Sequence, residues 1–208
     1  MTHVTDGTDE VRAFVAVLLG DAVRRPLVAL LTRASALPCD VKWVEVANLH
    51  VTVKFLGNVA STALPAIGQA LTEVARVTCP FEVTVAGLGT FPPRGVPRVV
   101  WVGLTANRAE ALSSFASSVD AALSSIGYPR EDRPFAAHVT IGRVRSPRGQ
   151  ADLKAFIENE SAFRAGRQSV PEVALMRSDL CPNGPVYTKL AAFSLGGRAA
   201  GEGRGSNR

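Results

Sequence analysis

Apolar and polar residues follow one another along this chain in two different rhythms. Alternation with a period of two is typical of a strand with one buried face, whereas apolar positions three and four residues apart are typical of an amphipathic helix. The strand pattern, or a short apolar run of strand length, occurs over 11–19, 41–44, 49–56, 81–88, 98–104, 138–144, 169–177 and 186–195. The helix pattern occurs over 21–34, 61–78, 107–126 and 151–159. Strands that follow one another through short loops, as well as across helices, predict an α+β fold with antiparallel or mixed sheets.

Two of these predicted strands carry the same short motif, a histidine followed two residues later by a threonine. His50 and Thr52 form the first pair, and His138 and Thr140 form the second. Because successive side chains of a strand point to opposite faces, each histidine shares a face with its threonine while the intervening valine points into the core. His3 lies in a third His-Val-Thr triplet, but its polar surroundings show no alternation, so we interpret that triplet as chance.

The spacing of the two motifs predicts an internally duplicated domain. They are separated by close to half of the ordered chain, and each predicted motif strand has a helix and further strands beside it. We therefore expect one domain of two α+β lobes over residues 11–195. Residues 1–10 are polar and residues 196–208 are rich in glycine without core-forming side chains, so we expect both to be flexible or disordered tails.

Composition narrows the class of protein without deciding its function. The chain has 208 residues, of which 47% are hydrophobic, and this is enough for one domain with a sizeable core. Its net charge of +5 suits an anionic ligand such as RNA, but the excess is modest. Cys39, Cys79 and Cys181 are odd in number and widely spaced, which argues against a disulfide framework or a zinc site. With no secretion signal and no long apolar run, the sequence predicts a soluble cytoplasmic protein.

The paired motifs suit acid–base chemistry on a phosphodiester. Two imidazoles, with pKa values near ~6.5, can hold one protonated and one neutral form at cellular pH. Two threonine hydroxyls can then stabilise the charge that develops on the phosphate oxygens. No metal or other cofactor is expected, because a zinc site needs three or four ligands and only two histidines lie in predicted structure. A single His-x-Thr strand would be interpreted as a half-buried polar pair, and the duplication is what favours catalysis.

The two motifs and several neighbouring blocks resemble the two-histidine phosphoesterase superfamily. The resemblance is to its bacterial and archaeal RNA 2′,3′-cyclic phosphodiesterases, formerly called 2′-5′ RNA ligases, and extends from about Arg12 to Leu195. One departure is Ala137, where the family commonly has proline immediately before the second histidine. The similar blocks, in chain order, are 12–16, 48–57, 87–92, 97–103, 133–135, 178–180 and 184–187.

This resemblance implies a fold and a set of roles. The fold would be bilobed and pseudo-symmetric, with two mostly antiparallel sheets facing a central cleft and helices outside. His50 would be the proton donor and His138 the proton acceptor, while Thr52 and Thr140 would bind the phosphate. The implied reaction is metal-independent hydrolysis of a 2′,3′-cyclic phosphate to a 2′-phosphomonoester. Its partners would be RNA ends or oligonucleotides that carry this group, and the protein would be a monomer without a membrane partner.

Three further side chains are candidates with open alternatives. Arg143 matches a family arginine that would bind the phosphate, but strict alternation turns it away from His138, so a strand end or a twist is needed. The alternative for Arg143 is a surface salt bridge. Phe55 either stacks on a base or packs in the core. Tyr187 either lines the cleft or only buries its ring.

Several other residues have ordinary structural roles as their alternatives. Lys54 has the parity of His50 and Thr52 and is either near the site or at a solvated strand end. Trp43 and Trp101 are interpreted as core or cleft-wall aromatics, and the charged loop 131–133 as solvated.

The sequence leaves two alternatives to RNA 2′,3′-cyclic phosphate hydrolysis. The same machinery would serve 2′-5′ joining of RNA ends, or hydrolysis of a small cyclic phosphate derived from a nucleotide. A non-catalytic module that binds RNA ends is the other alternative, and the intact pairs of histidine and threonine disfavour it.

Overall fold

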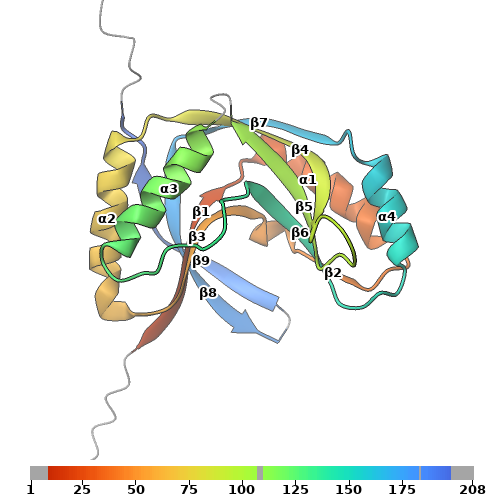
Figure 1. Cartoon of the computed structure of the whole chain (residues 1–208), viewed down its shortest axis with the longest axis horizontal. Coiled ribbons are helices and arrows are strands. Elements are labelled where there is room, and N and C mark those ends of the chain that lie inside the picture. Colours follow the sequence, from red (N-terminus) through yellow and green to blue (C-terminus); the bar gives the residue numbers. More distant parts are fainter. Residues whose placement is uncertain (1–8, 107–109, 183, 198–208) are drawn as a thin grey trace, which may run out of the picture.

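The computed structural model describes residues 9–106, 110–182 and 184–197, and within them the strands form one strongly curled sheet (Figure 1). The strands are β1 (Glu10–Leu18), β2 (Val41–Trp43), β3 (His50–Ala60), β4 (Phe81–Phe91), β5 (Val99–Ala106), β6 (His138–Val144), β7 (Arg164–Val170), β8 (Glu172–Cys181) and β9 (Gly184–Ser194). The helices are α1 (Asp21–Ser35), α2 (Leu64–Val77), α3 (Ala111–Ser124) and α4 (Gln150–Asn159), with short 3₁₀ turns η1 (Val46–Asn48) and η2 (Ser61–Ala63).

The sheet is continuous, so the prediction of two separate sheets is wrong. Its order is β7-β4-β5-β6-β3-β1-β8-β9, with β2 paired to β6, and the pairings are antiparallel. Val51 of β3 pairs with Val139 of β6, and this pair joins what would otherwise be two sheets. The predicted α+β class and the antiparallel strands are confirmed.

We call β3, β1, β8 and β9 the first half-sheet, and β6, β2, β5, β4 and β7 the second half-sheet. Each is built from both parts of the chain, because β1 and β3 of the first half-sheet are completed by β8 and β9 from the C-terminal part. Figure 1 shows α2 and α3 beside the first half-sheet, and α1 and α4 beside the second. Helix α1 therefore crosses from β1 to the opposite half of the molecule, where it packs against β7.

Strand β1 shows how alternation of side chains serves both faces of the sheet. Val15 and Val17 point into the main core under the helices. Phe14 and Ala16 point the other way and pack with Met176 in a small separate cluster. The sheet thus has a second apolar surface, on the face away from the helices, and the candidate site lies above it.

The predicted closing strand 169–177 is two strands in the structure. Strand β7 ends at Val170 and β8 begins at Glu172, with Pro171 between them. Proline has no backbone N–H to donate to a sheet, which suits a residue between two strands. The segment 164–170 was not predicted as a strand because its apolar residues do not alternate clearly.

The predicted tails lie mostly outside the described residues, as do His3 and the segments 1–8 and 198–208. At the described ends, Glu10 begins β1, while Gly196 and Gly197 donate backbone hydrogen bonds to Ala75 and Thr78 at the end of α2. No helix in the described ranges combines the length and the apolar character needed to cross a membrane.

Candidate active site

A cavity of about 600 Å³ opens between the two half-sheets and receives side chains from both. It contains both histidines and both threonines of the duplicated motif, together with Phe55, Arg143 and Tyr187, so every predicted site residue lines it. Its other lining residues are Arg12, Ala13, Phe14, Lys42, Trp43, Val44, Glu45, Asn48, Gly57, Phe91, Val99, Ser178, Leu180, Gly184 and Pro185.

The two histidines are brought together by the pair that joins the half-sheets. His50 and His138 are the first residues of β3 and β6, and each directly precedes one member of the Val51–Val139 pair. In the antiparallel register set by this pair, His50 lies across from Thr140 and His138 lies across from Thr52. Residues 50 and 138, far apart in sequence, therefore lie on adjacent strands of the sheet.

Both imidazoles are anchored in the same way. Nδ1 of His50 lies 2.7 Å from the carbonyl oxygen of Asn48, and Nδ1 of His138 lies 2.7 Å from that of Ala136. A carbonyl can only accept a hydrogen bond, so Nδ1 of each ring donates a proton to it. This fixes the tautomer and leaves Nε2 of each ring for chemistry in the cavity.

The threonine hydroxyls complete the group. Oγ1 of Thr52 lies 3.0 Å from Nε2 of His50. The hydroxyl of Thr140 lines the cavity and makes no side-chain hydrogen bond within the described residues. Both hydroxyls can therefore donate a hydrogen bond to a bound phosphate. Thr52 would give up its contact with His50 in order to do so.

The surroundings of His50 are the more apolar of the two. Its ring centroid lies 4.9 Å from that of Phe14 and 5.2 Å from that of Tyr187, which meets it edge-on. Burial lowers the pKa of the His50 imidazole, the hydrogen bond to Asn48 acts in the opposite direction, and the positive charges of His138 and Arg143 lower it further. In the absence of an anion His50 is therefore biased toward its neutral form.

Tyr187 lines the cavity, as one of its two sequence interpretations required. Its ring packs edge-on against Phe14, with the centroids 5.0 Å apart. Burial raises the pKa of its hydroxyl, and the nearby charges of Arg143 and Arg12 oppose that rise. Tyr187 therefore forms the wall on the β9 side.

A bulge after each motif decides which side chains reach the cavity. On β3, Lys54 pairs with Val15 and Thr52 pairs with Ala16, so Val53 is left without a partner on β1. Such an extra residue inverts the alternation beyond it. Phe55 consequently lines the cavity with 57% of its surface exposed, and the interpretation of Phe55 as a core residue is wrong.

The second motif has the same irregularity at the same place. On β6, Gly142 pairs with Val100 and Thr140 pairs with Trp101, so Ile141 has no partner on β5. This bulge turns Arg143 to the face of His138, which strict alternation did not allow. In the described residues Arg143 forms no salt bridge, so the surface ion pair considered for it is absent there.

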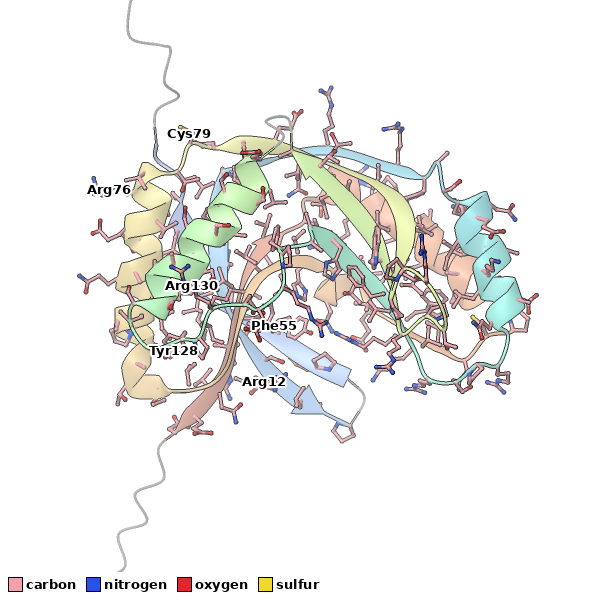
Figure 2. The ribbon with its side chains drawn as sticks, viewed as in Figure 1. Arg12, Phe55, Arg76, Cys79, Tyr128 and Arg130 are labelled. Atoms are coloured by element: carbon pink, nitrogen blue, oxygen red, sulfur yellow. The ribbon has the colours of Figure 1, made fainter. Side chains whose placement is uncertain are left out.

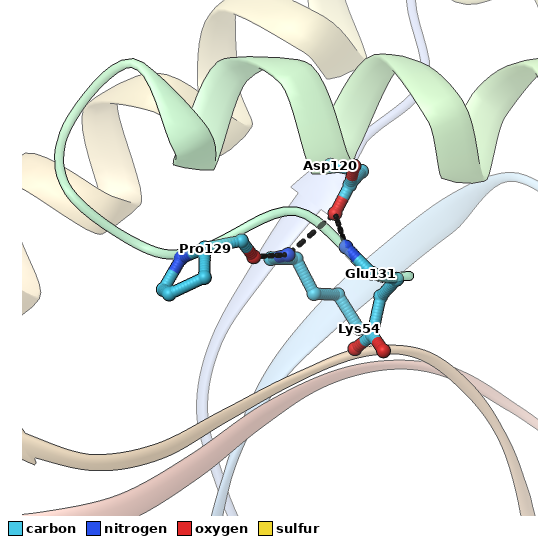
Figure 3. A network of polar contacts seen from close by, with 4 residues as sticks. All are labelled: Lys54, Asp120, Pro129 and Glu131. Carbon is cyan, nitrogen blue, oxygen red and sulfur yellow. Dashed lines mark hydrogen bonds and ion pairs between the residues drawn. The ribbon is translucent and has the colours of Figure 1, made fainter. Parts of the chain in front are cut away.

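Lys54 occupies neither of its two predicted positions, near the site or at a solvated strand end, because the bulge at Val53 turns its side chain away from the cavity and into the interior. Its side chain is 1% exposed, and Nζ lies 2.5 Å from Oδ1 of Asp120 on α3. Nζ also donates to the carbonyl oxygen of Pro129 at 2.6 Å, and Oδ1 of Asp120 accepts the amide of Glu131 (Figure 3). Lys54 therefore attaches strand β3 to helix α3 and to the segment that leads toward His138.

Three of the cavity residues that were not predicted bear directly on the site. Arg12 and Asn48 lie within the blocks of sequence that resemble the family, but no function was predicted for them. A polar side chain in or next to a predicted strand could have indicated a place in the site for each. Nδ2 of Asn48 donates to the carbonyl oxygen of Pro185 at 2.8 Å and so ties η1 to β9. Phe91 meets His138 edge-on, with ring centroids 5.0 Å apart, a contact that depends on the pairing of β4 with β5 and of β5 with β6.

The two tryptophans have different positions. Trp43 lines the cavity, while Trp101 packs against Phe91 with ring centroids 5.4 Å apart. The charged residues Glu131, Asp132 and Arg133 are exposed, as expected for a solvated loop. Among the described residues no group of three or more His, Cys, Asp or Glu side chains is placed to hold a metal ion.

Comparison with known proteins matches the LigT like Phosphoesterase family to residues 19–101 and 102–187, one match for each motif. The chain is 36% identical to an RNA 2′,3′-cyclic phosphodiesterase of Methanothermobacter thermautotrophicus, over 89% of this chain and 100% of that protein. It is 37% identical to one of Archaeoglobus fulgidus, over 88% of this chain and 99% of that protein. The crystal structure of TT0787 of Thermus thermophilus superposes with a TM-score of 0.75 at 32% identity, covering 89% of this chain and 98% of that one. The chain belongs to the LigT-like phosphoesterase family.

Proposed function

We propose that this protein hydrolyses 2′,3′-cyclic phosphates at RNA ends to 2′-phosphomonoesters without a metal ion. The observation that carries the proposal is the matched pair of imidazoles, each held through Nδ1 by a backbone carbonyl and each lining one cavity beside a threonine. The name of the two relatives above, RNA 2′,3′-cyclic phosphodiesterase, supports the choice of substrate.

In the proposed reaction His138 is the base. Its Nε2 takes a proton from water as the water oxygen bonds to phosphorus on the side opposite the 3′ oxygen. The bond between phosphorus and the 3′ oxygen breaks, and Nε2 of His50 gives its proton to that oxygen. The product keeps its phosphate on the 2′ oxygen, and one water is consumed.

The remaining site residues stabilise the charge of the transition state. Thr52 and Thr140 present hydroxyl donors from the two strands, and the guanidinium of Arg143 supplies a fixed positive charge. The anionic phosphate also offsets the low pKa of His50, because a negative charge nearby favours the imidazolium form. Substrate binding thus prepares His50 to act as the acid.

Substitution of the histidines tests the proposal. His50→Ala and His138→Ala should each lower kcat on RNA with a 2′,3′-cyclic phosphate end by a factor on the order of 10²–10⁴. Because the two rings act as a unit, the double variant should be scarcely slower than the slower single variant. Thr52→Ala and Thr140→Ala should lose less, since each removes one donor and no proton transfer.

His3→Ala is the matched control, because this histidine belongs to the triplet without a predicted strand around it, and it should keep full turnover. Near-full turnover by either His50→Ala or His138→Ala would exclude the mechanism. No turnover by the unaltered protein, with binding of the RNA end retained, would instead favour the non-catalytic module.

A further inference from the structure

Arg12 is a cation of the cavity that the proposed mechanism does not use. It is exposed on β1 and lines the cavity, and within the described ranges it forms no salt bridge and no side-chain hydrogen bond. Nearby on β8, the guanidinium of Arg177 is neutralised by Asp179, with Nε of Arg177 2.8 Å from Oδ1 of Asp179. An unpaired guanidinium in a cavity is available for an anionic ligand.

The register of β1 places Arg12 beyond the histidines along the cavity. Leu18 pairs with His50, Phe14 pairs with Phe55, and Arg12 pairs with Asn58. Arg12 and Phe14 share a face, and their Cα atoms are separated by two residues of strand, about 7 Å. The order along the cavity is therefore His50, then the two phenylalanines, then Arg12.

Between His50 and Arg12 the cavity wall is aromatic. The ring centroid of Phe14 lies 6.1 Å from that of Phe55, and the exposed face of Phe55 is open to a ligand. Figure 2 shows Phe55 on β3 and Arg12 on the neighbouring strand β1. An exposed aromatic ring provides a stacking surface for a nucleobase. The wall can thus receive one nucleoside between the cyclic phosphate and the guanidinium of Arg12.

We propose that Arg12 binds the phosphate on the 5′ oxygen of the terminal nucleoside, so that the site selects an RNA chain over a cyclic mononucleotide. This inference rests on the proposed function, because it takes the cyclic phosphate to lie at the histidines. Arg143 comes from the opposite half-sheet, five residues after His138, and serves the cyclic phosphate. The two arginines therefore bind successive phosphates of one strand.

The test compares two substrates of different length. One is adenosine 2′,3′-cyclic phosphate, and the other is the dinucleotide ApA with the same cyclic end, which adds an internucleotide phosphate. Arg12→Gln should lower kcat/KM for the dinucleotide about tenfold to a hundredfold, the usual cost of losing a charged hydrogen bond, and should act mainly on KM. The mononucleotide lacks the bound group, so its kcat/KM should stay unchanged.

A chemical substitution of the substrate makes the assignment specific. A methylphosphonate at the internucleotide linkage removes the negative charge, so it should raise KM for the unaltered protein and leave KM of Arg12→Gln unchanged. Arg12→Lys, which keeps the charge, should recover part of the preference for the dinucleotide. Arg177→Gln removes an equal charge from β8 and is the control, which should preserve the ratio of the two kcat/KM values.

Equal losses on both substrates would show that Arg12 acts on the cyclic phosphate or on the fold, and would overturn the inference. So would an unchanged ratio, or an equal methylphosphonate effect with and without Arg12. Hydrolysis of both substrates by the unaltered protein, combined with any of these outcomes, would leave the proposed function standing. Failure of the unaltered protein to hydrolyse either substrate would instead reject the proposed function itself.

Discussion

At the scale of single residues, two identical side chains are placed in different surroundings. His50 lies against Phe14 and Tyr187, whereas the ring of His138 meets that of Phe91. The anchoring of Nδ1 is the same for both rings, so the two histidines differ in the side chains that surround the ring. Because their surroundings differ, the two histidines can take different roles in proton transfer although they occupy equivalent positions of the duplicated motif.

The low pKa of His50 predicts the pH dependence of turnover. The proposed acid must be protonated, and its protonated fraction falls as pH rises through its pKa, so a lowered pKa moves the alkaline limb to lower pH. The alkaline limb of kcat/KM, which reports the free protein, should therefore lie below the ordinary histidine value of about 6.5. Bound phosphate raises the pKa again, so the alkaline limb of kcat should lie at higher pH than that of kcat/KM.

Arg143→Gln checks the cause of this shift, because it removes one of the positive charges that lower the pKa of His50. The maximum of kcat/KM should fall, while its alkaline limb should move to higher pH. Both limbs belong to the coupled pair of histidines rather than to either ring alone. An alkaline limb that stays in place, or moves to lower pH, in Arg143→Gln would contradict the electrostatic explanation.

At the scale of the elements, the two bulges determine the composition of the site. Beyond Val53 and Ile141 the alternation is inverted, which brings Phe55 and Arg143 to the cavity and buries Lys54. The position equivalent to Lys54 in the second motif is Gly142, where an added Cβ would come within 2.8 Å of Trp43. After the same bulge, the first motif therefore buries Lys54 against Asp120, whereas the second has a glycine that leaves room for Trp43.

The sequence alone predicted most of the strands and the shared face of each histidine and threonine, because both follow from local alternation. Strand β7 was not predicted, because its apolar residues do not alternate clearly. The sequence did not predict that Lys54 is buried, because this depends on the bulge at Val53. A bulge is defined by the pairing with the partner strand, and in the sequence Val53 does not differ from the other apolar residues of the run. The family resemblance indicates Arg143, whose side chain reaches the site because of the bulge at Ile141. The sequence also could not predict that the strands form a single sheet, because this depends on the pairing of Val51 with Val139, which are distant in sequence.

Stability measurements on the Lys54–Asp120 pair test the structural role of the buried lysine. Asp120→Ala should lower the free energy of unfolding by about 3–5 kcal/mol, because it leaves a buried ammonium without its counter-ion. Lys54→Met should cost less, since the side chain of Asp120 is 21% exposed, against 1% for Lys54, and keeps some hydration. Lys54→Met combined with Asp120→Leu should recover most of the loss.

Urea denaturation of these variants provides the measurement. Lys154→Met, which breaks the exposed pair of Lys154 and Glu158 on α4, is the matched control and should change stability by less than about 0.5 kcal/mol. A cost for Asp120→Ala as small as that of the control would mean that Lys54 is solvated in solution.

At the scale of the whole molecule, the candidate site lies where the two half-sheets of the curled sheet meet. Val51 and Val139 join the half-sheets, and the histidines stand directly beside this pair. The half-sheets separate beyond it and leave the cavity between them, with Arg143 on one side and Arg12 on the other. Because each half-sheet contains strands from both parts of the chain, the distance between the histidines depends on the complete fold.

Product analysis in the presence of a chelator distinguishes hydrolysis by two histidines from metal-assisted hydrolysis. RNA ending in a 2′,3′-cyclic phosphate is incubated with the protein in excess EDTA, and ³¹P NMR identifies the oxygen that keeps the phosphate. The two-histidine mechanism predicts undiminished turnover and a 2′-phosphomonoester, because two histidines supply both proton transfers and His50 protonates the 3′ oxygen. Loss of turnover in EDTA with rescue by a divalent ion would contradict the metal-independent mechanism, and a 3′-phosphomonoester would contradict the assignment of the acid.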